Sequence, residues 1–255
     1  MAEILQSIAP NVVEKFSELV EAFIQTLIMM GVSGIISFFF GLFFGVVLIV
    51  TRPGGILQNN LVYALLDKII NLFRSIPFII LIAALIPTTR LIVGTAIGTK
   101  GAILPLVFGT VPFFTRQIES ALAELDHGLI EAAQSMGSSP MEIIFRVYLR
   151  ESIPGIVRAT TITVISLIGL TAMAGVVGGG GLGDFAIRYG HQRNQVDITY
   201  ATVLIILAMV SLLQGIGNLI IRKTSHSAAA HKVVITRRFF GRDSATIDSF
   251  SSWPK

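Results

Sequence analysis

The sequence predicts an all-α polytopic membrane protein with five transmembrane helices. Hydrophobic residues make up 53% of the chain, charged residues only 13%, and the mean hydropathy is +0.79. These values are far from those of an average soluble protein. The charges are also unevenly spread, because long uncharged stretches alternate with short charged ones. Each long stretch can supply the roughly 20 apolar residues that a helix needs to cross a hydrocarbon core.

Three uncharged stretches are long enough to span a membrane without help, and they are Ala22–Thr51, Ala159–Gly183 and Ile198–Ile221. Two shorter uncharged runs lie between the first and second of these, Ser75–Thr89 and Gly101–Thr115. Each run extends to a full span if the charges at its edges reach the lipid headgroups or face protein. Those charges are Lys68, Arg74 and Arg116. The segment Leu91–Thr99 is too short to cross and is expected to form a loop or an interfacial turn.

The first 21 residues precede the first span and are predicted to form an amphipathic segment outside the membrane. Its start, Met-Ala-Glu, lacks the basic residues of a cleaved signal peptide. Apolar residues recur here at helical spacing, at Leu5, Ile8, Val12, Phe16 and Leu19. This pattern favours a helix on the outer membrane surface. A solvent-exposed helix leading into the first span is the alternative.

The distribution of Lys and Arg orients the chain with its amino terminus outside and its carboxyl terminus in the cytoplasm. In this orientation, five of the 19 Lys and Arg residues lie outside: Lys15, Arg90, Lys100, Arg188 and Arg193. The excess inside obeys the positive-inside rule. Residues 22–221 are then the transmembrane domain and residues 222–255 a basic cytoplasmic tail. Within the tail, 224–230 is expected to be a linker, and the rest to be flexible near anionic lipid, or alternatively to form a small ordered element around 233–239.

The segment between Leu129 and Pro154 contains two short helical patterns separated by Gly137. This glycine is placed to end the first helix in a left-handed conformation. Ser139-Pro140-Met141-Glu142 carries the cap, first-turn proline and capping-box glutamate of a helix start. Apolar residues then recur at Met141, Ile144, Phe145, Tyr148 and Leu149. They predict one apolar stripe on a helix too short to span a bilayer, so the stripe must dock on another surface.

This segment resembles the EAA loop of ABC importer permeases, a short coupling helix that fits a cleft on the ATP-hydrolysing subunit. The positions that match are Glu131, Ala132, Ala133 and Gly137, with Val147 and Leu149 as the later aliphatic pair and Arg150 in place of the usual proline. The resemblance implies a cytoplasmic coupling-helix (EAA) loop in which Glu131, Ala132, Ala133, Gly137 and Met141 couple to the ATPase. An ordinary helix-turn-helix on a soluble surface is the alternative.

Several other activities are not supported by the sequence. It has no G-x-x-x-x-G-K-[ST] phosphate loop, so an ATPase would have to be a separate subunit. The spacing of Gly178, Gly180 and Gly183 is read as a tight turn, because a dinucleotide motif follows a strand. The sequence contains no cysteine, and its four histidines are not spaced as metal ligands, so it indicates no metal, cofactor or catalytic residues. Its basic residues do not form the stripe that is typical of nucleic-acid binding. The three long spans hold no carboxylate for a gradient-driven carrier.

From about Glu21 to Lys223 the chain resembles the permease subunits of methionine ABC importers. The stretches that carry this likeness are Val50–Gly54, Asn71–Ile80, Ile92–Thr95, Gly128–Ala133, Ala172–Asp184 and Ala186–Gly190. The likeness implies a multi-pass protein of the bacterial inner membrane, working by alternating access. It also implies a second permease copy in a homodimer, two ATP-binding subunits and an external methionine-binding protein.

Candidates for the translocation pathway lie on the fourth span and are Ser166, Thr171 and Met173. The soft, flexible side chain of Met173 suits an apolar gate against a thioether substrate. Ordinary helix packing is the alternative explanation of Met173. Two other functions stay open: an ABC permease for another small amino acid or peptide, and a channel or gradient-driven carrier.

Overall fold

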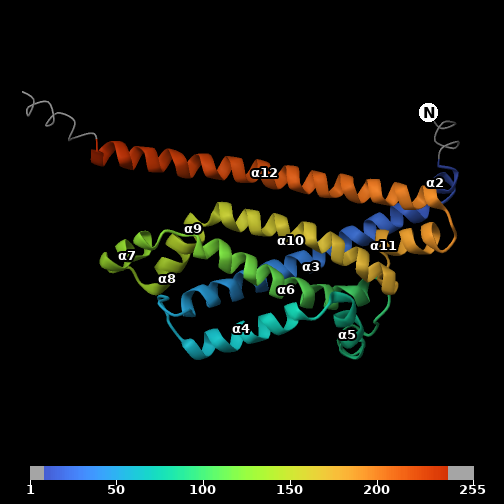
Figure 1. Cartoon of the computed structure of the whole chain (residues 1–255), viewed down its shortest axis with the longest axis horizontal. Coiled ribbons are helices and arrows are strands. Elements are labelled where there is room, and N and C mark those ends of the chain that lie inside the picture. Colours follow the sequence, from blue (N-terminus) through green and yellow to red (C-terminus); the bar gives the residue numbers. More distant parts are fainter. Residues whose placement is uncertain (1–8, 241–255) are drawn as a thin grey trace, which may run out of the picture.

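The protein is a bundle of helices arranged roughly side by side (Figure 1). The computed structural model describes residues 9–240, and the side chains of 9–224. In chain order the helices are α2 (Pro10–Glu14), α3 (Phe16–Thr51), α4 (Asn60–Ser75), α5 (Phe78–Val93), α6 (Gly98–Ala123), α7 (His127–Ser135), α8 (Pro140–Glu142), η1 (Ile143–Tyr148), α9 (Leu149–Glu151), α10 (Ile153–Ala174), η2 (Gly175–Gly179), α11 (Gly181–Phe185), η3 (Ala186–His191) and α12 (Val196–Phe240). The segments η1, η2 and η3 are π-helical turns.

Among the described residues, four helices are each long and apolar enough to cross a membrane, and they lie at Phe16–Thr51, Gly98–Ala123, Ile153–Gly179 and Val196–Thr224. The helices α4 and α5 pass the same test only as a pair, bent by 108°. The predicted five spans are therefore found if this pair is one broken span. Pro77 explains the break, because a proline forces the residue before it out of the helical conformation. Ile76 is accordingly extended, with φ −84° and ψ 123°.

The two ends of the bundle carry different elements. Figure 1 shows α7, α8 and the carboxyl end of α12 at one end, and α2, α11 and the start of α12 at the other. We refer to these as the α7 end and the α2 end. The α2 helix and the segment around Gly137 thus lie at opposite ends of the bundle.

Close packing of α3 against α6 forms the centre of the bundle. A Cβ atom added at Gly41 would lie 2.5 Å from Cδ1 of Phe114, and one at Gly45 would lie 2.5 Å from Cγ2 of Ile118. The two glycines therefore let α6 approach α3 to a distance that alanine would prevent. This is the packing role that a Gly-x-x-x-Gly spacing predicts.

Two connections differ from the sequence predictions. Only the middle of the predicted turn at Leu91–Thr99 is non-helical, because α5 continues to Val93 and ends at left-handed Gly94 (φ +83°), and α6 begins at Gly98. The predicted linker at 224–230 is wrong, since α12 continues through it to Phe240. The linker contains neither glycine nor proline, so nothing in its backbone breaks the helix. Residues 241–255 of the predicted tail lie outside the described residues.

The predicted amphipathic helix at the amino terminus is also different in the structure. Leu5 and Ile8 lie outside the described residues, and the remaining part divides at Lys15 into α2 and the start of α3. Val12 and Leu19 are buried in an apolar cluster with residues of α11 and α12. These two side chains thus pack on protein instead of lying on the membrane surface.

Asp197 at the start of α12 holds α2 in place. Its carboxylate accepts hydrogen bonds from the backbone N–H of Asn11 at 3.0 Å and from the side-chain amide of Asn11 at 2.9 Å. The side chain of Gln195 in turn donates to the Asn11 amide oxygen at 3.1 Å. This cluster supplies acceptors for the free N–H groups at the start of α2.

We expect Asp197→Ala to release α2 without disturbing the spans. The substitution removes the acceptor of the α2 backbone N–H groups, which is worth about 1–3 kcal/mol for a bond to a charged group. Hydrogen exchange at residues 11–14 should rise by about tenfold or more by that estimate, whereas exchange in α6 should stay the same. Equal protection of α2 in both proteins would contradict the role of Asp197.

Candidate functional site

The segment from α7 to α9, residues 127–151, is built by caps at each turn. The Asp126 side chain caps α7 by accepting from the Gly128 N–H at 2.9 Å. Gly137 ends the turn after α7 with a φ of +78°, and the Ser138 N–H donates to the carbonyl of Ala133 at 3.1 Å. Ser139 and Glu142 then form the capping box that the sequence predicts. The corner is therefore defined by local hydrogen bonds on both sides of Gly137.

Five apolar side chains attach this segment to three long helices. Ile130 and Ala133 of α7 and Ile143, Ile144 and Tyr148 of η1 are all buried. They belong to one cluster with Ile49 and Val50 of α3, Phe114, Ile118 and Leu122 of α6, and Ala159 of α10. Close packing transmits displacement because packed interiors have low compressibility. The α7–α9 segment is therefore packed directly against α3, α6 and α10.

The predicted apolar stripe on this segment is only partly right. Ile144 and Tyr148 are buried as expected, but Met141 and Phe145 are 59% and 61% exposed, and Ile143 is buried instead. The reason is the π-helical turn at 143–148, which places residues five apart on one face. Ile143 and Tyr148 therefore anchor the segment, while Met141 and Phe145 face outward.

The exposed face of the α7–α9 segment combines apolar and charged side chains, the charged ones being Glu131, Glu142, Arg146, Arg150 and Glu151. Its large exposed apolar side chains are Leu129, Met136, Met141 and Phe145. Glu131 is exposed and its carboxylate lies 3.1 Å from Nδ1 of His127. Of the two alanines that follow, Ala132 is exposed and Ala133 is buried, so only the first contributes to the flat outer surface. Such a face on a short helix is typical of a surface that contacts another protein.

The capping box also fixes the charge state of Glu142. The backbone N–H of Ser139 donates to this carboxylate at 2.9 Å and lowers its pKa, helped by the Ser139 hydroxyl at 3.0 Å. Because the folded pKa is lowered, the stabilisation is present above the unfolded pKa and lost as the pH falls through the folded value. The box is therefore intact at neutral pH. Nearby, burial raises the pKa of Tyr148, which keeps this phenol neutral inside the cluster.

A groove of about 380 Å³ lies between α10, α6 and the bend that joins α4 to α5. Ser166 and Met173 line it together with Thr163, Gly169 and Leu170 of the same helix. Thr171 is not among the lining residues; it is 1% exposed and its hydroxyl donates to the carbonyl of Ile168 at 2.7 Å. Ser166 and Met173 are two turns apart and share a face, whereas position 171 lies about 140° around the helix from Ser166. The structure thus brings two of the three predicted pathway residues to one groove.

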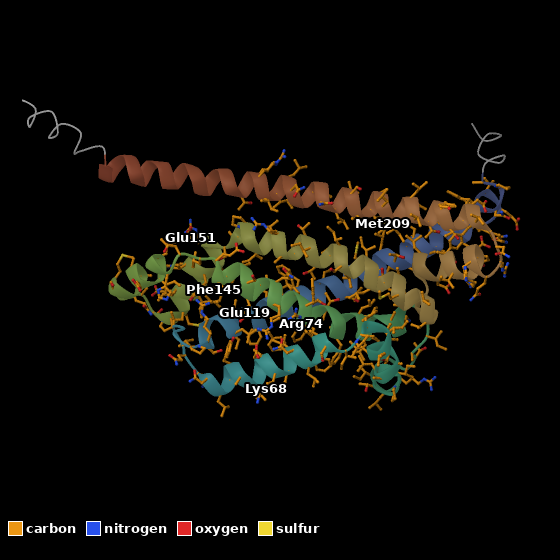
Figure 2. All side chains as sticks on the ribbon, in the orientation of Figure 1. Lys68, Arg74, Glu119, Phe145, Glu151 and Met209 are labelled. Carbon is orange, nitrogen blue, oxygen red and sulfur yellow. The ribbon has the colours of Figure 1, made fainter. Side chains whose placement is uncertain are left out.

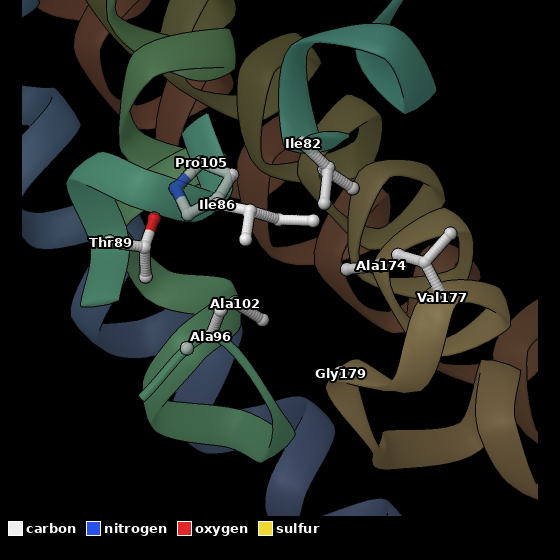
Figure 3. A pocket seen from close by; sticks show the side chains of 10 residues that line it. Ile82, Ile86, Thr89, Ala96, Ala102, Pro105, Ala174, Val177 and Gly179 are labelled. Atoms are coloured by element: carbon white, nitrogen blue, oxygen red, sulfur yellow. The ribbon is translucent and has the colours of Figure 1, made fainter. Parts of the chain in front are cut away.

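A much smaller cavity, of about 20 Å³, lies nearer the turn after α10 and is drawn in Figure 3. Its lining comes from α5, α6, the connection between them, the end of α10 and the η2 turn, and includes Thr89, Ala102, Ala174 and Gly179. The Thr89 hydroxyl is buried and lacks a partner among the described residues. The volume is enough for one water molecule bound to that hydroxyl, and too small for an amino acid.

The turn at 178–183 is tight, as its glycines predict. Gly178, Gly180 and Gly181 all have positive φ. The N–H groups of Gly181 and Leu182 donate to the side chains of Gln25 and Thr26 on α3, at 2.8 and 2.9 Å. The glycines therefore serve close helix packing, in agreement with the prediction of a turn in place of a nucleotide site.

The bundle has a broken second span and, at Gly137, a corner with exposed apolar side chains on either side. Together with the family match, these features define the class of the protein as a transmembrane permease of a transport system. The chain belongs to the family of binding-protein-dependent transport system inner membrane components, whose family model matches residues 37–226. Family membership accounts for the multi-span inner-membrane fold. It also agrees with our prediction that the chain is not itself an enzyme.

Individual relatives cover most of the chain. It is 47% identical over 202 residues to the probable D-methionine transport system permease protein MetI of Vibrio cholerae, covering 79% of this chain and 90% of that protein. It is 52% identical over 151 residues to the D-methionine transport system permease protein MetI of Escherichia coli K12, covering 59% and 70%. A solved structure of the MetNI methionine ABC transporter, in an inward-facing conformation, matches with a TM-score of 0.81 and 45% identity over 83% of this chain and 98% of that one.

Sequence reasoning missed several residues of these two surfaces. Leu129, Met136 and Phe145 are exposed beside the predicted Glu131 and Met141. For Phe145 the helical periodicity misleads, because the π-helical turn at 143–148 changes which face is buried. Arg74 lines the groove, although the sequence suggested only that it extends a span. Its position just before Ser-Ile-Pro, a helix break between two apolar runs, is the signal that points to this role.

Proposed function

We propose that this chain is the permease subunit of an ATP-driven importer, and that it forms the translocation pathway for methionine, D- or L-, across the bacterial inner membrane. The substrate is supported by the names of the relatives and of the matching transporter structure. The observation that carries the mechanism is the α7–α9 segment, which exposes large apolar side chains on its outside and is anchored inside to three long helices.

In this proposal the α7–α9 segment docks on an ATP-binding subunit in the cytoplasm. Glu131, Ala132 and Met141 lie on its outer face, Gly137 forms the corner, and Ala133 belongs to its buried anchor. When ATP binding closes the two ATPase subunits, the segment moves with them. The buried cluster around Ile143 and Tyr148 then moves α3, α6 and α10, and the groove beside α10 changes its access from one side to the other.

A second permease copy completes the pathway. Ser166 and Met173 line the groove but are exposed in a single chain. Five spans hardly enclose a regulated channel, whereas two such grooves facing each other do. Met173 is then the apolar gate, and Thr171 supports the gate from within the helix.

The remaining assignments concern the regions outside the pathway. Residues 1–21 lie outside, where a methionine-binding protein delivers substrate, residues 22–221 form the translocation domain, and residues 222–255 lie in the cytoplasm near membrane lipid. The opposite placement of α2 and α7 in the bundle supports this orientation.

We expect Glu131→Lys to abolish coupling while the permease remains inserted in the membrane. The carboxylate is exposed and pairs with His127 of the same helix, so its reversal leaves the fold intact and repels a basic partner. The measurement is ATP-dependent uptake of labelled methionine into liposomes that contain the permease and its ATPase subunits, with the external binding protein present. Uptake should be lost, and retention of the ATPase subunits on the purified permease should fall.

Glu14→Lys is the matched control for retention of the ATPase subunits. The side chain of Glu14 is 66% exposed, compared with 68% for Glu131, but it lies in α2 at the opposite end. This variant should retain the ATPase subunits fully. Normal ATP-driven uptake by Glu131→Lys would overturn the coupling role. ATP hydrolysis by the unaltered complex without methionine uptake would keep the importer and exclude the substrate.

A further inference from the structure

An arginine without an ionic partner among the described residues lines the groove beside α10. Arg74 lies in the last turn of α4, immediately before the bend at Pro77. Figure 2 shows it about midway along the bundle, between the α7 end and the α2 end. Among residues 9–224, no carboxylate forms a salt bridge with Arg74 and no hydrogen bond from its guanidinium is found. Within that part of the chain, the cation therefore lines the groove unpaired.

A second arginine of this region, Arg116, does have ionic partners. Arg116 of α6 forms salt bridges with Asp67 and, at 2.6 Å, with Glu119, and it also donates to the Asn71 side chain at 3.0 Å. This network joins α4 to α6. Arg116 thus has the partners that a charge inside a membrane protein normally requires, whereas residues 9–224 offer none to Arg74.

Arg74 is exposed in the single chain, about midway along the bundle, and an unpaired guanidinium within a membrane is costly unless an anion or water reaches it. The carbonyl groups at the carboxyl end of α4 give partial compensation, because the helix dipole favours a cation there. They do not supply the bidentate acceptor that best matches a guanidinium, which is a carboxylate. The position of Arg74 is therefore suited to transient binding of a carboxylate.

Other groups in the same groove suit the rest of an amino acid. Thr110 of α6 lines the groove, is 1% exposed, and its hydroxyl has no hydrogen-bond partner among the described residues. Ser166 adds a second hydroxyl from α10. Phe113, Leu170 and Met173 supply an apolar wall. One cation, two hydroxyl groups and an apolar surface together match a carboxylate with an apolar side chain.

We propose that Arg74 recognises the α-carboxylate of the amino acid during its passage through the permease. The guanidinium of Arg74 binds the carboxylate of the amino acid. The hydroxyl groups of Thr110 and Ser166 form hydrogen bonds with the polar groups of the amino acid, and its side chain lies against Leu170 and Met173. This inference rests on the proposed function as an amino-acid importer. It adds a residue that selects for a free carboxylate inside the membrane, after release from the external binding protein.

The test uses the permease with its ATPase subunits in nanodiscs, held with a non-hydrolysable ATP analogue and without the binding protein. Bound labelled methionine is measured for the unaltered complex, Arg74→Gln and Arg74→Lys, with unlabelled methionine or methioninamide as competitor. Methioninamide keeps the side chain and lacks the carboxylate. The unaltered complex should prefer methionine by about tenfold or more, the expected effect of losing a charged hydrogen bond. Arg74→Gln should lose this preference, and Arg74→Lys should keep part of it.

Arg90→Gln is the control, because Arg90 is also exposed on the broken span but does not line the groove. It should retain the preference for methionine. If Arg74→Gln keeps the preference for methionine over methioninamide, the proposal is overturned. Loss of the second permease copy from Arg74→Gln would also overturn it, because the carboxylate that pairs with Arg74 would then come from the partner copy.

Uptake assays distinguish a failure of the proposed function from a failure of the role of Arg74. If the unaltered complex imports no methionine, the proposed function itself fails; if it does and Arg74→Gln imports equally well, only the role of Arg74 fails.

Discussion

Gly137→Val should strongly reduce ATP-driven uptake while the permease still folds into the membrane. Gly137 has a φ of +78°, and an L-residue there costs about 1–2 kcal/mol, with more for a β-branched side chain. A Cβ atom at this position meets nothing within 4 Å, so the effect comes from the backbone and not from a clash. The corner must then change its direction, and the face with Glu131 and Met141 no longer matches the ATPase subunit. We expect at least about a tenfold loss of uptake for a misdirected contact of this kind.

Gly137→Asn is the informative companion variant, because asparagine adopts the left-handed conformation far more readily than valine. It should retain most of the uptake. Gly31→Val tests valine at a helical position of α3 that also has open space around it, and it should leave coupling intact. Equal uptake by the valine and asparagine variants at position 137 would show that the left-handed corner is not required.

Gly183→Ala should cause the largest loss of stability of any single-methyl substitution at the α2 end. The added Cβ would collide with the backbone carbonyl oxygen of Ala172 and lie 2.7 Å from the Cα of the same residue. Neither atom can move without displacing α10, so the tight turn after that helix must open. We expect the free energy of unfolding to fall by about 1–3 kcal/mol, the usual cost of overpacking. Thermal unfolding of the purified protein in detergent measures the change.

Gly215→Ala on α12 is the control for that experiment, since a Cβ there meets nothing within 4 Å. Alanine also has a higher helix propensity than glycine, so this variant should be as stable as the original protein or slightly more so. A Gly183→Ala protein that unfolds at the same temperature as Gly215→Ala would contradict the close approach of α11 to α10.

Much of the local structure could be predicted because it depends on neighbours in the sequence. The capping box of Ser139 and Glu142 and the left-handed Gly137 are decided within a few residues, and both are found. The long apolar spans follow from the cost of placing charges in lipid. The motif at Glu131 also indicates the family from the sequence alone, since its pattern is contiguous.

The positions of individual side chains depended on longer-range packing. The exposure of Met141 and Phe145 could not be predicted, because ordinary α-helical spacing does not hold in the π-helical turn at 143–148, where Ile143 and Tyr148 pack on α3, α6 and α10. Thr171 and Ser166 are both polar residues of one apolar helix, and only their angular separation against α6 decides which one lines the groove. The linker expected at 224–230 is instead part of α12, because its loop-like composition includes no glycine or proline to end the helix.

The sequence by itself determined the class of the molecule, its five spans and its capped corner, because hydropathy and capping act over neighbouring residues. The tertiary structure alone decided which faces are free for function. It bent the second span by 108° at Pro77 and left Arg74 without an ionic partner among residues 9–224, while Arg116 was paired with Asp67 and Glu119. Arg74 and Arg116 have the same chemistry, and they differ in whether the fold places a carboxylate beside them. Contacts between segments that are distant in the sequence decide this difference.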